Sequence, residues 1–172
     1  MLWYKPQTLE LRSWEPGLDE EGWEVVDDLF VPELPLENLK TMKKEELVQA
    51  AASAYTEGFW SKATGETLFY DSEVEDQHIL ESLYNRAQEK DWKTTERYKG
   101  ICPTGQAPIR ARKEIKGVKA VYFHTKEQLI KLGKDLESHI IAVKLKHWNL
   151  QESLQLAKNA EEIEKITWDE KY

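Results

Sequence analysis

The first 35 residues carry the period-two alternation of apolar and polar side chains that is typical of β-strands. The run 9–12, Leu-Glu-Leu-Arg, alternates in this way, and Pro16-Gly17 after it is a turn signal. A second strand is predicted over residues 23–31, with an interruption at its Asp-Asp pair. Pro32 and Pro35 end this strand, because proline has no backbone N–H to donate to a sheet.

Beyond this segment the pattern predicts helices and one hairpin. A first helix is expected to begin after Thr41, where apolar residues recur every three or four positions, and to stop at Gly58. Residues 59–70 predict a hairpin that turns at Gly65. Four later helix starts show a capping residue three positions before a Glu or Gln: Ser72, Thr125, Asn149 and Asn159.

Two of these helices hold many apolar residues, and a strand lies between them. The helix after Ser72 holds Ile79, Leu80, Leu83, Tyr84 and Ala87. The helix after Thr125 is predicted to be the longest, with a stripe of Leu129, Leu132, Leu136, Ile140, Val143 and Trp148. Residues 118–124 alternate like a strand, whereas residues 91–117 are expected to form a loop.

The sequence therefore predicts an α+β fold. A short N-terminal β segment and a small hairpin come before a mainly helical C-terminal module. We divide the chain into an extended docking segment over residues 1–40 and an α+β module over residues 41–172, with residues 32–40 as the linker.

Composition excludes several classes of protein. The 172 residues include 24 Lys or Arg and 32 Asp or Glu, a net charge of −8, which argues against binding to nucleic acid. No run of about 18 apolar residues is present, so we expect no membrane span. The single cysteine, Cys102, leaves no intramolecular disulfide and fits a reducing cytosol.

No pattern indicates catalysis, a metal or a cofactor. The four histidines are scattered, and we expect His139 and His147 to lie at the surface or at an interface. The acidic cluster of Asp71, Glu73, Glu75 and Asp76 lacks the spacing of a calcium loop and fits a helix start better. No motif of a serine nucleophile, phosphate loop or dinucleotide site occurs. We therefore predict a protein that is not an enzyme.

Tryptophan is the unusual feature of the composition. Three of the seven tryptophans fall in the first 23 residues, a stretch with few aliphatic side chains to bury them. Tryptophan and tyrosine are enriched at protein interfaces. We predict a partner-binding surface made of Trp3, Tyr4, Trp14, Trp23 and Phe30.

A series of short motifs extends from about Tyr55 to the C-terminus, over roughly two thirds of the chain. It comprises residues 58–70, Asp71-Ser72, Asp76-Gln77, the run Tyr122 to Leu129, a long helix through His139, residues 150–154, Ala160 to Ile163, and Ile166-Thr167-Trp168. This series resembles an uncharacterised domain family of short phage and prophage proteins encoded in the tail region, often labelled tail fibre assembly proteins. Residues 91–117 are longer than the family pattern, and the N-terminal segment has no counterpart in it.

The resemblance implies a bacteriophage tail protein that acts by binding a tail fibre or baseplate protein. It would be a lasting virion component or an assembly chaperone, present in the host cytoplasm during tail assembly and then in the virion tail. Because fibres are commonly trimeric, the resemblance also implies three copies on a fibre. The family has no known catalytic residues, so none is carried over to this chain.

Two alternatives to a tail protein stay open. The first is a cytosolic adaptor or regulatory protein that is absent from virions. The second is a small hydrolase that acts on cell-wall or capsule sugar. A glycoside hydrolase needs two facing carboxylates, and the sequence singles out no such pair.

Overall fold

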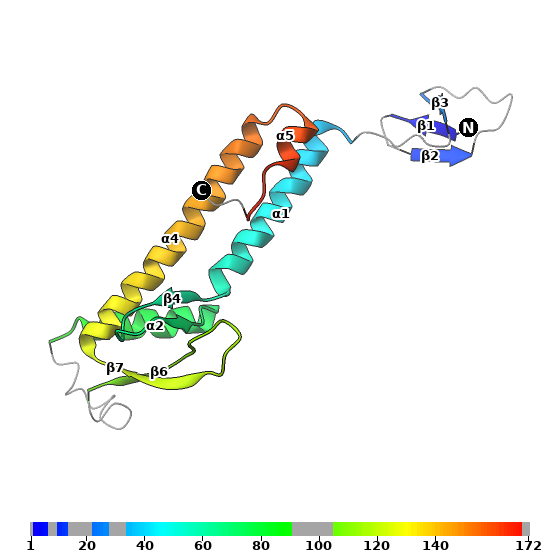
Figure 1. Cartoon of the computed structure of the whole chain (residues 1–172). Coiled ribbons are helices and arrows are strands. Elements are labelled where there is room, and N and C mark those ends of the chain that lie inside the picture. Colours follow the sequence, from blue (N-terminus) through cyan, green and yellow to red (C-terminus); the bar gives the residue numbers. More distant parts are fainter. Residues whose placement is uncertain (1, 7–9, 14–21, 28–33, 91–104, 170–172) are drawn as a thin grey trace.

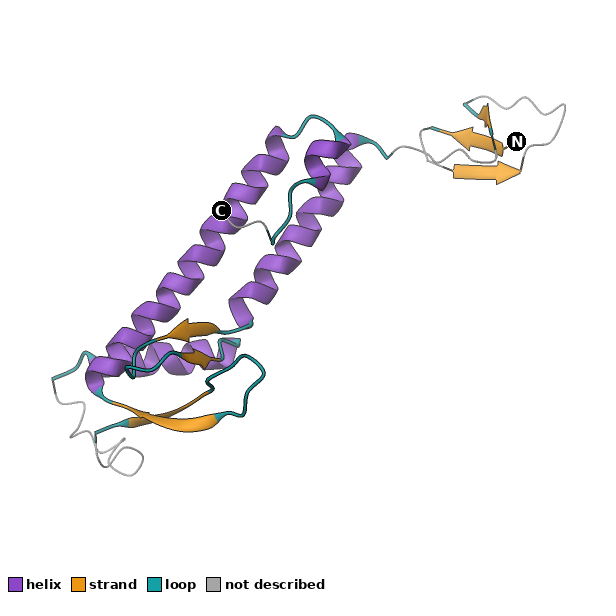
Figure 2. Ribbon diagram, viewed as in Figure 1, coloured by secondary structure: helices purple, strands orange, loops and turns teal. Residues whose placement is uncertain are grey.

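A computed structural model describes residues 2–6, 10–13, 22–27, 34–90 and 105–169. It has the predicted α+β fold (Figures 1 and 2). The strands are β1 (Leu2–Lys5), β2 (Glu10–Ser13), β3 (Glu24–Val26), β4 (Phe59–Ser61), β5 (Leu68–Tyr70), β6 (Ala107–Ala111) and β7 (Ala120–His124). The helices are α1 (Leu36–Thr56), α2 (Val74–Ala87), α4 (Lys126–Leu156) and α5 (Ala160–Glu164).

The N-terminal segment forms a three-stranded antiparallel sheet in the order β2-β1-β3. The predicted strand 9–12 is present as β2, with Leu9 outside the described residues. The predicted strand 23–31 is β3, which ends before the Asp pair as expected, and residues 28–31 lie outside the described part. Residues 28–33, which connect the sheet to the remaining elements, lie outside the described residues. The sheet and the remaining elements are therefore described separately.

The first helix begins earlier than predicted. α1 starts at Leu36, so the expected start after Thr41 is wrong and the linker expected over 32–40 does not extend past Pro35. Proline suits a helix start because the first N–H groups have no partner within the helix. Leu36 and Leu39 pack against the core of α1, α4 and α5, which makes the helix stable from its first turn. The predicted stop at Gly58 is confirmed, since α1 ends at Thr56.

Ser72 does not cap α2, contrary to prediction. The N-cap is Glu73, and no side chain caps that helix. The fully buried Ser72 hydroxyl instead accepts a hydrogen bond from the Gly58 amide (3.0 Å) and donates one to the Tyr55 carbonyl oxygen (2.8 Å). The Gln77 side-chain amide donates to the same Tyr55 oxygen (3.1 Å) and to the Ser72 carbonyl (2.7 Å). This cluster, the Ser72 joint, ties the end of α1 to β4, β5 and α2.

The long helix α4 begins at the predicted capping box. The Thr125 hydroxyl accepts from the Gln128 amide, and the Gln128 side chain accepts from the Thr125 amide. A separate helix starting at Asn149 is wrong, because α4 continues to Leu156 and buries Leu150 and Leu154 against α1 and α5. The cap of α5 is confirmed, with Asn159 accepting from the Glu162 amide at 2.9 Å.

Two apolar clusters account for most of the core. One joins β4, β5, α2, β6 and the first half of α4, and the other joins α1, α5 and the second half of α4. Trp148, which the sequence placed on the apolar stripe of α4, is in fact 53% exposed. Ile79 on α2 is 58% exposed.

Strand β6 lies within the stretch expected to be a loop. It pairs with β7 over Ala107 to Ala111, and its extension pairs with β5 through the backbone of Arg112 and Phe69. This strand was not predicted because Gly105 and Pro108, two residue types that are disfavoured within strands, lie in this stretch. The predicted strand at residues 118–124 is confirmed as β7, and the predicted hairpin as β4 and β5, with Gly65 at a φ of +94°.

We predict that Gly58→Ala destabilises the protein far more than Gly65→Ala. Gly58 has a φ of +108°, and a Cβ there would lie 2.4 Å from the Phe69 ring and 2.6 Å from the Tyr70 carbonyl oxygen. Gly65 also has positive φ, but a Cβ there meets nothing within 4 Å. Urea unfolding should show a loss of about 3 kcal/mol for Gly58→Ala and about 1 kcal/mol for Gly65→Ala. Equal losses of unfolding free energy in the two variants would contradict the close approach of Gly58 to Phe69 and Tyr70.

Candidate interaction surfaces

One face of the N-terminal sheet carries tryptophan and basic side chains in alternation. The register places Trp3 opposite Arg12 and Val25, which puts these three side chains on the same face. The Arg12 guanidinium lies 4.2 Å from the Trp23 ring centroid and 6.0 Å from that of Trp3. Lys5 Nζ lies 5.7 Å from the Trp23 centroid. We call this surface, made of Trp3, Lys5, Arg12, Trp23 and Val25, the tryptophan–arginine face.

The predicted binding residues differ in exposure. Trp3 (5%) and Tyr4 (8%) are buried, so the expectation that this segment has too few aliphatic side chains to bury its tryptophans does not hold for Trp3. Trp23 is half-buried, while Trp14 and Phe30 lie outside the described residues. Lys5 and Arg12 could not be recognised from the sequence, because only the strand register shows that they lie beside the tryptophans.

Trp3 also carries a polar group that has no partner among the described residues. Its indole Nε1 is buried and forms no hydrogen bond with any part of the protein that the structure describes. A buried donor without an acceptor costs about 1–3 kcal/mol. Val25 on the same face is 48% exposed, and Leu11 on the other face is 42% exposed. The small sheet therefore keeps an unsatisfied donor and uncovered apolar side chains.

Charge is concentrated in the same segment. Residues 1–35 contain nine Asp or Glu and two Lys or Arg, which is a net charge of −7 out of the total of −8. The remaining 137 residues are therefore nearly neutral. An acidic segment attracts basic surfaces and speeds encounter with them.

A buried histidine–tyrosine pair lies in the core. The Tyr70 hydroxyl is 2.9 Å from His124 Nε2, and His124 Nδ1 is 3.0 Å from the Tyr122 carbonyl oxygen. A carbonyl only accepts, so Nδ1 carries the hydrogen and Nε2 accepts from the hydroxyl. Burial lowers the pKa of His124 and raises the pKa of Tyr70 to about 12. Both side chains are buried, and the pair links β5 to β7.

His139 joins α4 to the end of α1. Its Nε2 lies 3.0 Å from the Ala54 carbonyl oxygen, and its ring stacks on Phe59 with centroids 6.0 Å apart. His147 lies beside Trp168, with ring centroids 6.4 Å apart. Both histidines expected at a surface or interface are thus partly buried within the fold.

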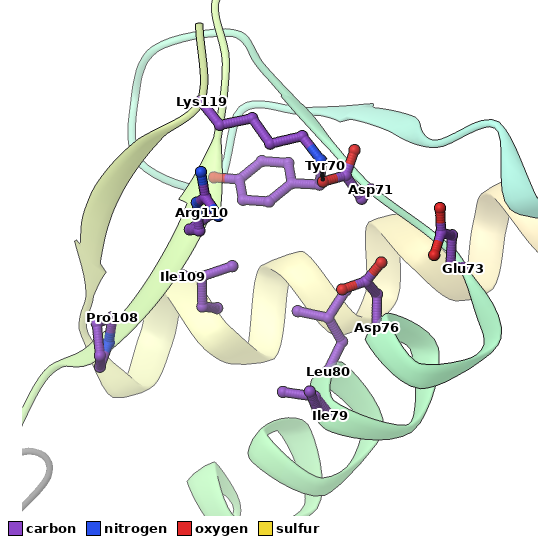
Figure 3. Close-up of a pocket in the computed structure, with 10 residues that line it drawn as sticks. All are labelled: Tyr70, Asp71, Glu73, Asp76, Ile79, Leu80, Pro108, Ile109, Arg110 and Lys119. Atoms are coloured by element: carbon purple, nitrogen blue, oxygen red, sulfur yellow. Dashed lines mark ion pairs between the residues drawn. The ribbon is translucent and has the colours of Figure 1, made fainter.

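A pocket of about 350 Å³ lies between α2 and β6 (Figure 3). Leu80 and Ile109 form part of its apolar wall, and the carboxylates of Glu73 and Asp76 face Arg110 across it. Asp71 does not extend an acidic site, because its carboxylate pairs with Lys119 (2.6 Å) and with Arg112 (2.9 Å). Within the described ranges, no three His, Cys, Asp or Glu side chains are grouped so that they could hold a metal ion.

The motifs that carry the family resemblance occupy structural positions. Ser72 and Gln77 form the Ser72 joint, Thr125 and Gln128 cap α4, and His139 bonds to α1. The closing Ile166 and Trp168 belong to the core of α1, α4 and α5 or pack against it. The fold therefore accounts for these residue types.

We predict an acid-labile contribution to stability from His124. Its pKa lies below the ordinary 6.5 in the folded chain, so the unfolded chain binds more protons as the pH falls through about 6.5. The free energy of unfolding should fall over that interval and level off below the folded pKa. His124→Gln, which retains an acceptor for Tyr70, should lose this dependence in urea titrations, whereas exposed His78→Gln should keep it. An unchanged pH profile in His124→Gln would contradict the assignment.

No helix in the part of the chain that the structure describes has the length and apolar character needed to cross a membrane. Comparisons with protein-family models, with curated proteins and with solved structures found no match to this chain.

Proposed function

We propose that this chain is a bacteriophage tail protein that binds a tail fibre or baseplate protein, as a virion component or as a chaperone of fibre assembly. The observation that carries the proposal is the tryptophan–arginine face, in a segment that holds most of the net charge. The resemblance of residues 55–172 to phage tail-region proteins supports the identity of the partner.

The chemistry of the N-terminal sheet defines the surface that it would bind. Its acidic side chains favour a partner rich in Lys and Arg, and exposed Val25 and half-buried Trp23 favour an apolar centre within that surface. Buried Trp3 and Tyr4 support the sheet, so Trp23, Val25 and Arg12 are the residues placed to touch the partner.

The positions of the family motifs also support the proposal. Motifs that form the Ser72 joint, the cap of α4 and the contact between His139 and α1 are distributed over the body of the fold. A resemblance of this kind is expected when two chains share a fold. In this proposal the helical body is the scaffold, and the N-terminal sheet, which has no counterpart in the family pattern, selects the partner.

We predict that Val25→Lys and Trp23→Ala each weaken binding to newly made tail fibre of the same phage by about tenfold or more. Val25→Lys places a positive charge in the apolar centre of the contact, where a basic partner repels it, and Trp23→Ala removes an aromatic anchor. Binding is measured by titrating the full-length chain against purified fibre. The matched control is Val118→Lys, which adds the same charge at a site that is 93% exposed outside the sheet.

The result distinguishes the proposal from the adaptor hypothesis. Loss of binding in both sheet variants, with circular dichroism and thermal unfolding unchanged, supports docking through the sheet. Binding that all three variants retain would move the docking surface to another part of the chain. A wild-type chain without affinity for fibre or baseplate would overturn the tail proposal and favour a cytosolic adaptor.

A further inference from the structure

The far face of α4 carries a second, uncovered stripe. Leu136, Val143 and Leu150 point into the core. The opposite side of the helix presents six exposed residues, which we call the α4 stripe: Lys134, Ser138, Ile141, Leu145, Trp148 and Glu152. Its three central members are large and apolar, with exposures of 48% for Ile141, 49% for Leu145 and 53% for Trp148.

The spacing of the α4 stripe matches a helix–helix seam. Its members follow one another at alternating intervals of four and three residues, which is the heptad repeat of the a and d positions in coiled coils. A surface helix of a monomer normally presents polar residues on the side that faces away from the core. This repeat therefore indicates a second helix packed on α4 from outside.

The order of residues along the stripe is complementary to itself when reversed. Two antiparallel copies related by a two-fold axis would place Ile141 against Leu145 of the second copy. The bulky Trp148 would face the small Ser138, and Lys134 would face Glu152. Each contact occurs twice, and every layer of the seam pairs large with small, apolar with apolar, or positive with negative.

We propose that two copies of this chain associate through the α4 stripe as an antiparallel dimer. A parallel pair is disfavoured, because it would set Lys134 against Lys134, Glu152 against Glu152 and Trp148 against Trp148. Neither Lys134 nor Glu152 forms an ion pair with any described residue, so both charges are available across the interface. Lys144 flanks the seam near the axis, and its ammonium lies 4.9 Å from the centroid of its own Trp148 ring.

This choice of partner rests on self-complementarity. An unrelated helix would need its own matching order of charge and size, whereas a second copy supplies that order by symmetry. The inference does not depend on the proposed function, since the stripe is on α4 and the proposed docking face is on the N-terminal sheet.

Sedimentation velocity of the full-length chain tests the dimer. We expect a reversible monomer–dimer equilibrium over about two decades of concentration. Leu145→Glu should give a monomer throughout, because it buries a charge against Ile141 of the second copy. The control is Val48→Glu, which adds the same charge on α1 at a comparable exposure of 46% and should leave the dimer intact.

Charge reversal tests the antiparallel arrangement. Lys134→Glu and Glu152→Lys should each weaken the dimer by roughly tenfold, because each turns two attractive contacts into repulsive ones. The double variant Lys134→Glu/Glu152→Lys should recover most of the wild-type affinity. Circular dichroism checks that the variants keep their helices. The four substituted positions, Val48, Lys134, Leu145 and Glu152, are all exposed.

Several outcomes would overturn the proposal. A wild-type chain that stays monomeric at every concentration excludes the dimer, and a trimer excludes the two-fold arrangement. A dimer that persists in Leu145→Glu lies on another surface. A double reversal as weak as the single ones excludes the antiparallel register.

Discussion

Burial of one side of α4 is the constraint on which most of the structure depends. α4 packs against α1, α2, β4 and β7, so it spans both apolar clusters of the core. Each residue of a helix is turned by about 100° relative to the one before it, so burial of Leu136, Val143 and Leu150 leaves Ile141, Leu145 and Trp148 on the opposite side. The core and the uncovered stripe therefore follow from the same helical pattern.

The Ser72 joint is the second constraint. Its hydrogen bonds offset the desolvation cost of burying polar groups. Its hydroxyl and the Gln77 amide satisfy backbone groups at the end of α1 and the start of β4. Gly58 permits this junction, because its positive φ and missing side chain let the chain pass close to Phe69. The buried polar groups of this region, including His124 and Tyr70, are thus used to connect strands and helices. In our account the function resides on the surfaces of the molecule, in the N-terminal sheet and the α4 stripe.

The sequence predicted those elements whose signals are local. The cap at Thr125, the cap at Asn159, the stop at Gly58 and the turn at Gly65 each depend on a few neighbouring residues, and each is present. The predictions were wrong at positions where contacts between distant parts of the chain determine the secondary structure. Ser72 bonds to Tyr55 and Gly58 instead of to its own helix, Asn149 stays inside α4 because Leu150 is buried, and β6 forms despite Pro108 because β7 lies beside it. The candidate surface shows the same limit, since its tryptophans were visible in the sequence while Arg12 joined them only through the strand register.

If this chain functions by binding a phage tail fibre or baseplate protein, as we propose, it must occur in tail complexes. Quantitative mass spectrometry of purified virions, combined with isolation of newly made tail fibre from infected cells, measures the ratio of the chain to the fibre. We expect a fixed ratio in the virion if the chain is a tail component, or a fixed ratio only on new fibre if it is a chaperone. Absence of the chain from the virion, from new fibre and from baseplate intermediates would overturn the proposed function.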